Sequence, residues 1–347
     1  MKAHYLLFFL LPLLWNCSGD DAAQEYQNVP VAYAVPSNFP PLTYNLANNP
    51  ITEKGFELGK KLFYDGRLSS DGIVSCGFCH EQSSAFTHHG HTFSNGVDGA
   101  VGTRNTPAIQ NMGYLNSYMY DGVTTHLDLQ PIIPFLSDIE MHGNFTTAIA
   151  MMKADPKYAK LYKLAFADGQ VNTDNMMKAL SQFMVMLTSS NSKFDKYRRH
   201  ETGGDLSAAE LDGYAVFDQK CASCHATDLF TDQSFRNNGL PVNPQINDMG
   251  RYRVTLDDND KYKFKVPSLR NVEKTAPYMH DGRLFTLEAV LDHYDSGIVA
   301  SATLDAGLSH NGVLGIPLSS DEKTKIIAFL KTLTDTQFLT DHRFSEY

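Results

Sequence analysis

The sequence predicts a mostly α-helical protein built from two related halves. A five-residue motif occurs twice, as CGFCH at residues 76–80 and as CASCH at residues 221–225. Similar segments flank the two copies in the same order, which indicates an internal duplication. Amphipathic stretches with helical spacing fill much of the remaining chain, and no series of alternating polar and apolar residues points to a large sheet.

A helical pattern precedes each motif. Residues 51–64 carry apolar positions at helical spacing, with Thr52 as the predicted N-cap. Residues 206–220 repeat the pattern, and Ser207 followed by Glu210 predicts a capping box. Further amphipathic helices are expected over residues 144–153, 172–187 and 320–333.

A second pair of matching segments follows the motifs. Residues 107–111 (PAIQN) and 267–271 (PSLRN) each precede a Tyr-Met-x-Asp-Gly turn, at 118–122 and at 278–282. The proline and the tyrosine are 11 positions apart in both copies. The second copy has about 15 more residues between its motif and its proline, and we expect these to form a loop.

Length and composition fit a globular protein of two domains. The 347 residues allow each half its own core, and we place the domains at residues 51–205 and 206–347. The chain is 42% hydrophobic and 20% charged, which is ordinary for a folded protein. A net charge of −10 gives no electrostatic support for nucleic-acid binding.

The first 17 residues are expected to be a secretion signal. Lys2 precedes an apolar run over residues 5–15, which is too short to span a bilayer. Cys17 ends the run, as in a bacterial lipoprotein signal, so we expect a lipid anchor on Cys17 and a protein on the periplasmic side of a membrane. An ordinary signal peptide cut further along is the alternative. Residues 18–50, rich in Asn, Pro and Ala, are expected to form a tether.

The repeated motif is the attachment site of a c-type haem. Its two thiols add across the two vinyl groups of one porphyrin, and the following histidine lies under the iron. Zinc binding is disfavoured because the two pairs are 145 positions apart, and a disulfide within so short a loop is strained. A thiol redox pair needs no following histidine. The sequence therefore predicts two c-type cytochrome domains with two covalently bound haems, held by Cys76, Cys79, His80, Cys221, Cys224 and His225.

Together these motifs make the chain similar to the bacterial di-haem cytochrome c peroxidase family, which includes the enzyme that matures methylamine dehydrogenase. The resemblance covers residues 50–335 and includes RNTP at 104–107, IEM at 139–141 and TAPYMHDG at 275–282. It implies that the first haem reacts with hydrogen peroxide and that the second relays electrons from a small cytochrome c or a cupredoxin. A homodimer is common in the family.

Site residues follow from the same resemblance. Gln130 and Glu140 match the two polar groups on the peroxide side of the first haem, where a carboxyl group can move a proton between the peroxide oxygens. Asn105, Thr275 and Pro277 match the positions that hold an inter-domain calcium ion.

Three positions depart from the common pattern of the family. Val97 replaces a distal histidine, so the first haem is expected to be open, unless His88, His89 or His91 ligates instead. Tyr294 stands where the second haem usually has a methionine ligand, as in the maturation enzyme, and His293 beside it is the alternative. Tyr120 takes the place of a tryptophan between the haems.

The sequence thus predicts an oxidoreductase that reduces hydrogen peroxide. The first alternative is an oxidase that modifies a partner protein, which ligation by Tyr294 would favour. The second is a di-haem electron carrier without catalysis, which would require a six-coordinate first haem and an idle Glu140.

Overall fold

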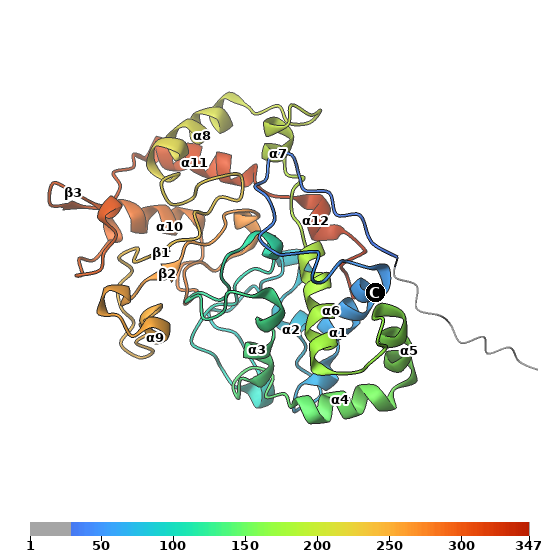
Figure 1. The fold of residues 1–347 in the computed structure, drawn as a ribbon. Coiled ribbons are helices and arrows are strands. Elements are labelled where there is room, and N and C mark those ends of the chain that lie inside the picture. The colour runs from blue at the N-terminus through green and yellow to red at the C-terminus, as the bar shows by residue number, and fades with distance from the viewer. Residues whose placement is uncertain (1–28, 347) are drawn as a thin grey trace, which may run out of the picture.

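The two copies of the repeat fold into two helical halves that lie side by side (Figure 1). The computed structural model describes residues 29–346, so the predicted signal and Cys17 lie outside the described residues. The first half contains α1 (Glu53–Phe63), α2 (Cys76–Cys79), α3 (Ile132–Leu136), α4 (Phe145–Ala154), α5 (Pro156–Ala165) and α6 (Thr173–Met186). The second half contains α7 (Lys193–Arg198), α8 (Ala208–Lys220), α9 (Tyr252–Thr255), α10 (Leu287–Asp292) and α11 (Ser320–Lys331), and α12 (Thr336–Thr340) follows.

Strands are few and short in the described residues, which confirms the prediction of a mostly helical fold. They form two antiparallel ribbons, β1 (Phe235–Arg236) with β2 (Phe264–Lys265) and β3 (Ser309–His310) with β4 (Val313–Leu314). The first ribbon frames the loop that is longer in the second copy. No helix of residues 29–346 has the length and apolar character needed to cross a bilayer.

The five predicted helices are all present, with their predicted caps. Thr52 accepts the backbone N–H of Gly55 at the start of α1. Ser207 and Glu210 form a reciprocal capping box at the start of α8. The helices α5, α7, α9 and α12 were not predicted; all of them except α5 are only four to six residues long.

Each half is centred on one close helix crossing. In the first half α1 packs on α6, and a Cβ added at Gly59 would lie 2.0 Å from the Ala179 carbonyl oxygen. In the second half α8 packs on α11, and a Cβ at Gly213 would lie 1.9 Å from the Lys325 carbonyl oxygen. Because only glycine leaves room for such an approach, the two equivalent glycines set the helix spacing in both halves.

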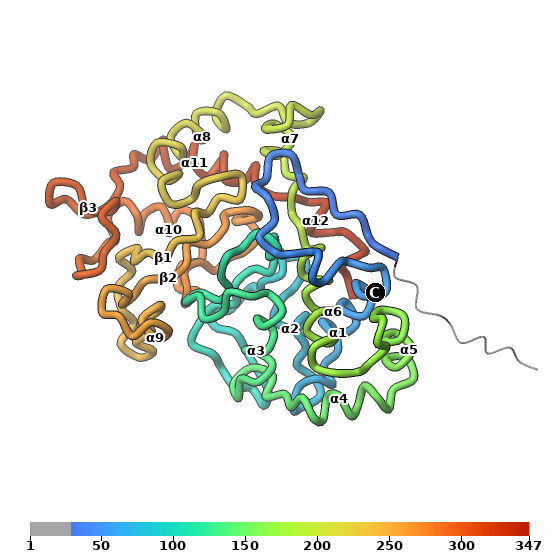
Figure 2. Tube along the Cα trace, viewed as in Figure 1, coloured from blue at the N-terminus to red at the C-terminus, as the bar shows by residue number. Residues whose placement is uncertain are grey.

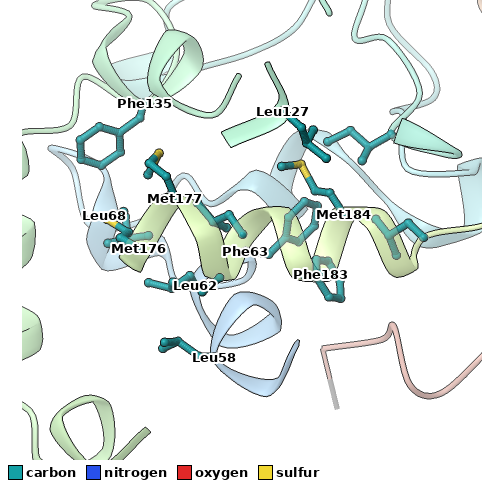
Figure 3. Packing of buried hydrophobic residues seen from close by; sticks show 14 of the residues in the cluster. Leu58, Leu62, Phe63, Leu68, Leu127, Phe135, Met176, Met177, Phe183 and Met184 are labelled. Atoms are coloured by element: carbon teal, nitrogen blue, oxygen red, sulfur yellow. The ribbon is translucent and has the colours of Figure 1, made fainter. Parts of the chain in front are cut away.

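The first core fills the angle between α1 and α6. Leu58 and Leu62 of α1 are fully buried and lie toward Phe183 and the methionines of α6 (Figure 3). The second core gathers Phe194, Phe217, Phe230 and Phe329 in edge-to-face and tilted contacts. These packed faces hold the loops that carry the two Cys-x-x-Cys-His motifs.

The duplication is visible in single hydrogen bonds. Asn111 and Asn271, the last residues of the PAIQN and PSLRN segments, both adopt left-handed backbone conformations with φ of 57°. Asn111 donates its backbone N–H to Leu187, just after α6, and Asn271 donates to Leu333, just after α11. Equivalent residues therefore tie equivalent loops to equivalent helices in the two halves.

The segment expected to be a tether is packed against the protein from residue 29 onward. Figure 2 shows this N-terminal part of the trace running beside α7 and α12 to α1. Phe39 contacts Tyr114 of the first half edge to face, and its ring lies over the Arg270 guanidinium of the second half. Burial of Tyr44 and Asn49 extends this contact, so residues 29–50 form a strap across both halves.

The boundary between the two cores does not follow the domain division expected at residue 205. A segment before that position packs in the second core, and the C-terminal segment packs in the first core. Phe194 of α7 belongs to the core of the second half. Phe338 and Phe344, near the C-terminus, belong to the core of the first half. Arg270 forms a fully buried ion pair with Asp195, which fixes α7 to the second half.

Candidate haem site

The first motif forms α2, a single helical turn that presents both thiols on one side. The Ser75 hydroxyl caps this turn by accepting the backbone N–H of Phe78. His80 follows, and its Nδ1 donates to the Phe86 carbonyl oxygen over 2.7 Å. A histidine that donates through Nδ1 is held in the orientation that leaves Nε2 available to an iron.

The second motif repeats this arrangement after α8. The His225 backbone N–H bonds the Cys221 carbonyl oxygen over 3.0 Å, and its Nδ1 lies 3.0 Å from the Phe230 carbonyl oxygen. Both histidine rings are buried, which lowers their pKa values, to about 4 for His80. Both imidazoles are therefore neutral at pH 7, the form that ligates a metal.

A cavity of about 450 Å³ runs along both motifs and joins the two halves. Its volume is in the range of cofactor sites. Both cysteine pairs and both histidines line it, and the four thiols form no disulfide. Among the described residues, no group of three or more His, Cys, Asp or Glu side chains is arranged to hold a metal ion by itself. The paired thiols and oriented histidines on the cavity wall fit two haem c groups.

Gln130 and Glu140 line the cavity in the first half. Gln130 leads into α3, is buried, and donates its side-chain amide to the Met119 sulfur over 3.6 Å. Glu140 lies in the turn after α3, and its Oε2 is buried without a hydrogen-bond partner. Burial raises the pKa of the Glu140 carboxyl group, and the Arg104 guanidinium partly opposes this shift.

Glu140 is electrostatically close to the first cysteine pair. Burial raises the pKa of the Cys79 thiol to about 11, and the negative charge of Glu140 adds to that shift. The same carboxylate contributes to the raised pKa of Cys76. The structure thus brings the predicted proton-transfer group and the first haem attachment site together.

Val97 is hydrogen-bonded to Glu140 through the backbone. Val97 is 2% exposed, and its backbone N–H donates to the Glu140 carbonyl oxygen over 2.9 Å. Gly96 approaches the Ile139 carbonyl so closely that a Cβ would lie 2.1 Å from its oxygen. The loop over residues 94–101 is therefore fixed against the turn that carries Glu140, with an apolar residue where a distal histidine was the family expectation.

The three neighbouring histidines face elsewhere: in the described structure, none of them lines the cavity. His88 is buried, stacks on His91 at 4.0 Å, and accepts the Thr106 backbone N–H through Nε2. The His89 ring pairs with Glu81 over 3.0 Å. These positions favour an open first haem over ligation by one of the three.

Tyr294 lines the cavity in the second half, whereas His293 does not. Both belong to a π-helical turn, His293–Gly297, that continues α10. π-turns often occur at functional sites because the extra residue re-aims the side chains around it. The His293 Nε2 donates to the Asn238 carbonyl oxygen over 3.1 Å, and the Asn238 side chain bonds the Tyr294 phenol. Of the two candidates for the second haem, Tyr294 is therefore the better placed.

Tyr120 lies on the cavity wall where the halves meet. Its carbonyl oxygen accepts the backbone N–H of Lys265 over 2.8 Å. Burial raises the pKa of its phenol, and Arg104 opposes this shift. Arg104 itself bridges the halves, with Nη1 2.7 Å from Asp121 and Nη2 2.9 Å from Asp248. The contact between Asp248 and Arg104 was not predicted from the sequence, because no motif near Asp248 indicates such a partner.

The three predicted calcium residues meet at the same junction. Asn105, Thr275 and Pro277 all line the cavity, and the Asn105 backbone N–H crosses to the His280 carbonyl oxygen over 2.7 Å. The Asn105 side-chain amide donates to Thr92, which leaves its oxygen as a ligand. The set offers oxygen donors without a carboxylate, so waters would have to complete a calcium shell.

Comparisons with known proteins place these features in one family. The family model for the di-haem cytochrome c peroxidase matches residues 53–203. The methylamine utilization protein MauG of Methylorubrum extorquens is 36% identical over 299 residues, which cover 82% of this chain and 79% of that protein. The cytochrome c551 peroxidase of Nitrosomonas europaea is 34% identical over 81% of this chain and 80% of its own length.

A solved structure agrees with the fold. The crystal structure of a MauG-like protein associated with microbial copper homeostasis superposes with a TM-score of 0.81 at 32% identity. It covers 91% of this chain and 99% of that one. The expectation of two cytochrome c-type halves is thereby confirmed.

Proposed function

The chain belongs to the di-haem cytochrome c peroxidase family, whose members carry haem c, and on that basis we propose that it reduces hydrogen peroxide to water. Two electrons and two protons convert one peroxide into two waters. The observation that carries the proposal is the Glu140 carboxyl group on the wall of the cavity that holds His80: its Oε2 is buried and has no hydrogen-bond partner among the described residues. Burial of such a group has a stability cost, which a proton-transfer role explains.

Cys76, Cys79 and His80 would hold the first haem, which would supply the redox chemistry for peroxide reduction. Glu140 takes a proton from one peroxide oxygen and returns it to the other, which leaves as water. The raised pKa of Glu140 suits this two-way transfer, because burial makes the protonated form of the carboxyl group easier to reach than in an exposed glutamate. Gln130 orients the peroxide through its amide, whose position is fixed by the contact with Met119.

The second half is proposed as the entry point for electrons. A small cytochrome c or a cupredoxin would deliver them to the haem held by His225, with Tyr120 as the aromatic group between the haems. The shared cavity supports this division into a peroxide-reducing half and an electron-accepting half. Its donor would meet the protein on the periplasmic side of a membrane, where a lipid on Cys17 would anchor it. Calcium at Asn105, Thr275 and Pro277 and a homodimer remain predictions.

Glu140→Gln tests the proposal. Because the amide cannot carry the proton, we expect kcat/KM for hydrogen peroxide to fall about 10²- to 10⁴-fold with a small redox donor in excess. The measurement is stopped-flow oxidation of the reduced donor, with haem content and absorption spectra checked in parallel. Glu81→Gln is the matched control, since Glu81 lies near the same motif but is 38% exposed and pairs with His89.

A specific observation favours a second function. Tyr294 lines the cavity that also contains His225, and a tyrosine at this position is a feature in which the sequence resembles the maturation enzyme. A MauG-like role, in which the oxidising equivalents modify a partner protein, is therefore the alternative. The two functions differ in the rate of turnover with a small donor: a peroxidase oxidises the donor rapidly, at two equivalents per peroxide, whereas a maturation oxidase turns over slowly without its protein substrate.

A non-catalytic electron carrier has less support. It would leave the buried Glu140 without a role, and it would need a sixth ligand on the first haem. The positions of His88, His89 and His91 outside the cavity wall argue against such a ligand.

A further inference from the structure

Four cationic side chains line the cavity, and three of them are paired with carboxylates. Arg104 pairs with Asp121 and Asp248, as described above. Lys220 pairs with Glu322 over 2.6 Å, and Arg236 pairs with Asp305 over 2.9 Å. Lys265 is the fourth, and among the described residues it forms no ion pair. Within residues 29–346 the one hydrogen-bond partner of its Nζ is the Ser117 carbonyl oxygen, at 2.6 Å.

Lys265 is held firmly at the junction of the halves. It belongs to β2, and its backbone N–H donates to the Tyr120 carbonyl oxygen. Its Nζ lies 6.0 Å from the centre of the Tyr118 ring. The strand and these two contacts to the first half fix the position of the ammonium group, which cannot leave for the solvent without breaking them.

An ammonium group in this position has unused donors. Lysine carries three N–H groups, and only one has a partner here. Taking an unpaired charge out of water is unfavourable, so lysines enclosed within a protein are normally paired with a carboxylate. Burial accordingly lowers the pKa of Lys265, to about 8, in the absence of an anion. Lys265 therefore directs unused donors toward an acceptor that the described residues do not include, on the wall of the cavity.

We propose that Lys265 binds a carboxylate of the porphyrin periphery, the propionate of one of the two haems. A haem attached through its vinyl groups keeps two propionates, which are the anions that such a cavity would receive. The ion pair would hold the haem edge beside Tyr120, and the positive charge would raise the reduction potential of that haem. The inference does not depend on peroxide reduction, only on the two haems.

Redox titration of the holoprotein, without peroxide, tests this inference. In Lys265→Gln the amide can still donate to Ser117 but carries no charge, so we expect the midpoint potential of one haem to shift downward. Lys265→Arg keeps the charge and should keep both potentials. Lys263→Gln is the control: Lys263 is a near neighbour outside the cavity wall and pairs with Asp260 over 3.5 Å.

Each result decides the inference. A downward shift confined to Lys265→Gln supports it, and the haem that shifts identifies the propionate. Unchanged potentials of both haems in Lys265→Gln overturn it. If Lys265→Gln fails to bind two haems, retention of both by Lys265→Arg supports a role for the charge. Failure of both variants indicates a packing role and overturns the proposal.

Discussion

Single residues decide the acid–base behaviour of the site, and the Glu140 carboxyl group is set by two opposing effects. Burial raises its pKa, and the Arg104 guanidinium lowers it. Arg104 is itself partly neutralised by Asp121 and Asp248. The charge that Glu140 experiences therefore depends on residues from both halves of the chain.

This arrangement predicts the pH dependence of the reaction. The carboxylate form of Glu140 accepts the first proton, so activity is present above the pKa and is lost as the pH falls through it. Because burial raises that pKa, the acid limb of kcat/KM should lie above 4.5, the ordinary value for glutamate. Arg104→Gln should move the limb to higher pH. Asp248→Asn should move it to lower pH, since it leaves Arg104 with more net charge. If the wild-type protein, Arg104→Gln and Asp248→Asn all gave the same dependence of kcat/KM on pH, the assignment of the acid limb to Glu140 would be contradicted.

Tyr294 gives a second prediction at this scale. A phenolate stabilises ferric iron, whereas a methionine ligand favours the ferrous state. Tyr294→Met should therefore raise the midpoint potential of the second haem, as measured by spectroelectrochemical titration. His293→Gln is the comparison, because His293 bonds the Asn238 carbonyl and does not line the cavity. A larger shift in the His293 variant would show that the histidine is the ligand.

At the level of elements, the close crossings α1–α6 and α8–α11 position the haem-binding loops. Gly59 and Gly213 allow these crossings because their missing side chains admit the backbone of the partner helix. The helices themselves follow from local sequence, through the caps Thr52 and Ser207 and the apolar spacing. Their packing onto partners far along the chain does not.

Gly59→Ala tests the importance of the crossing. The new methyl group would meet the Ala179 carbonyl, which is backbone and cannot move aside, so we expect a loss of about 1–3 kcal/mol in the free energy of unfolding. Gly55→Ala is the control within the same helix. There the methyl group meets the end of a side chain instead of backbone, so we expect a smaller loss, although Gln182 is buried and would have to adjust its hydrogen bonds with Thr52 and Asn49. Urea denaturation followed by circular dichroism measures both.

Local features of this fold could be predicted from the sequence, and long-range ones could not. The motifs gave both haem attachment sites, because a two-thiol spacing followed by histidine is a local pattern. The internal repeat gave the two halves. Sequence alone could not show that residues 29–50 pack across both halves, since a polar, proline-rich segment has no periodicity that identifies a partner. For the same reason the exchange of Phe194 and Phe338 between cores was not foreseen.

The site shows the same limit. Gln130 and Glu140 were identified through resemblance, and the cavity wall brings both to the first motif. Lys265 and Asp248 were missed because their importance depends on what faces them across the junction. Lys265 lies two positions before Pro267 of the repeat, and no sequence pattern indicates that a lysine lines a cavity without a carboxylate partner.

For the whole molecule, the main consequence of the duplication is one cavity shared by two halves. Each half contributes a cysteine pair and a histidine, and the junction contributes Tyr120, Arg104 and Lys265. Because the halves also exchange their ends and share the strap, the two haem sites cannot move far apart without unpacking a core. We infer that electron transfer between the haems occurs at a fixed separation.

The most direct test of the account is the reaction of the purified protein with one equivalent of hydrogen peroxide. Absorption and EPR spectra would be recorded for the fully oxidised and the half-reduced protein, together with the peroxide that remains. With Val97 in place of a ligand, we predict a high-spin first haem, and consumption of the peroxide by the oxidised protein within the mixing time. Two low-spin haems, with the peroxide unconsumed by both the fully oxidised and the half-reduced protein, would contradict the account. The protein would then be better explained as an electron carrier without catalysis.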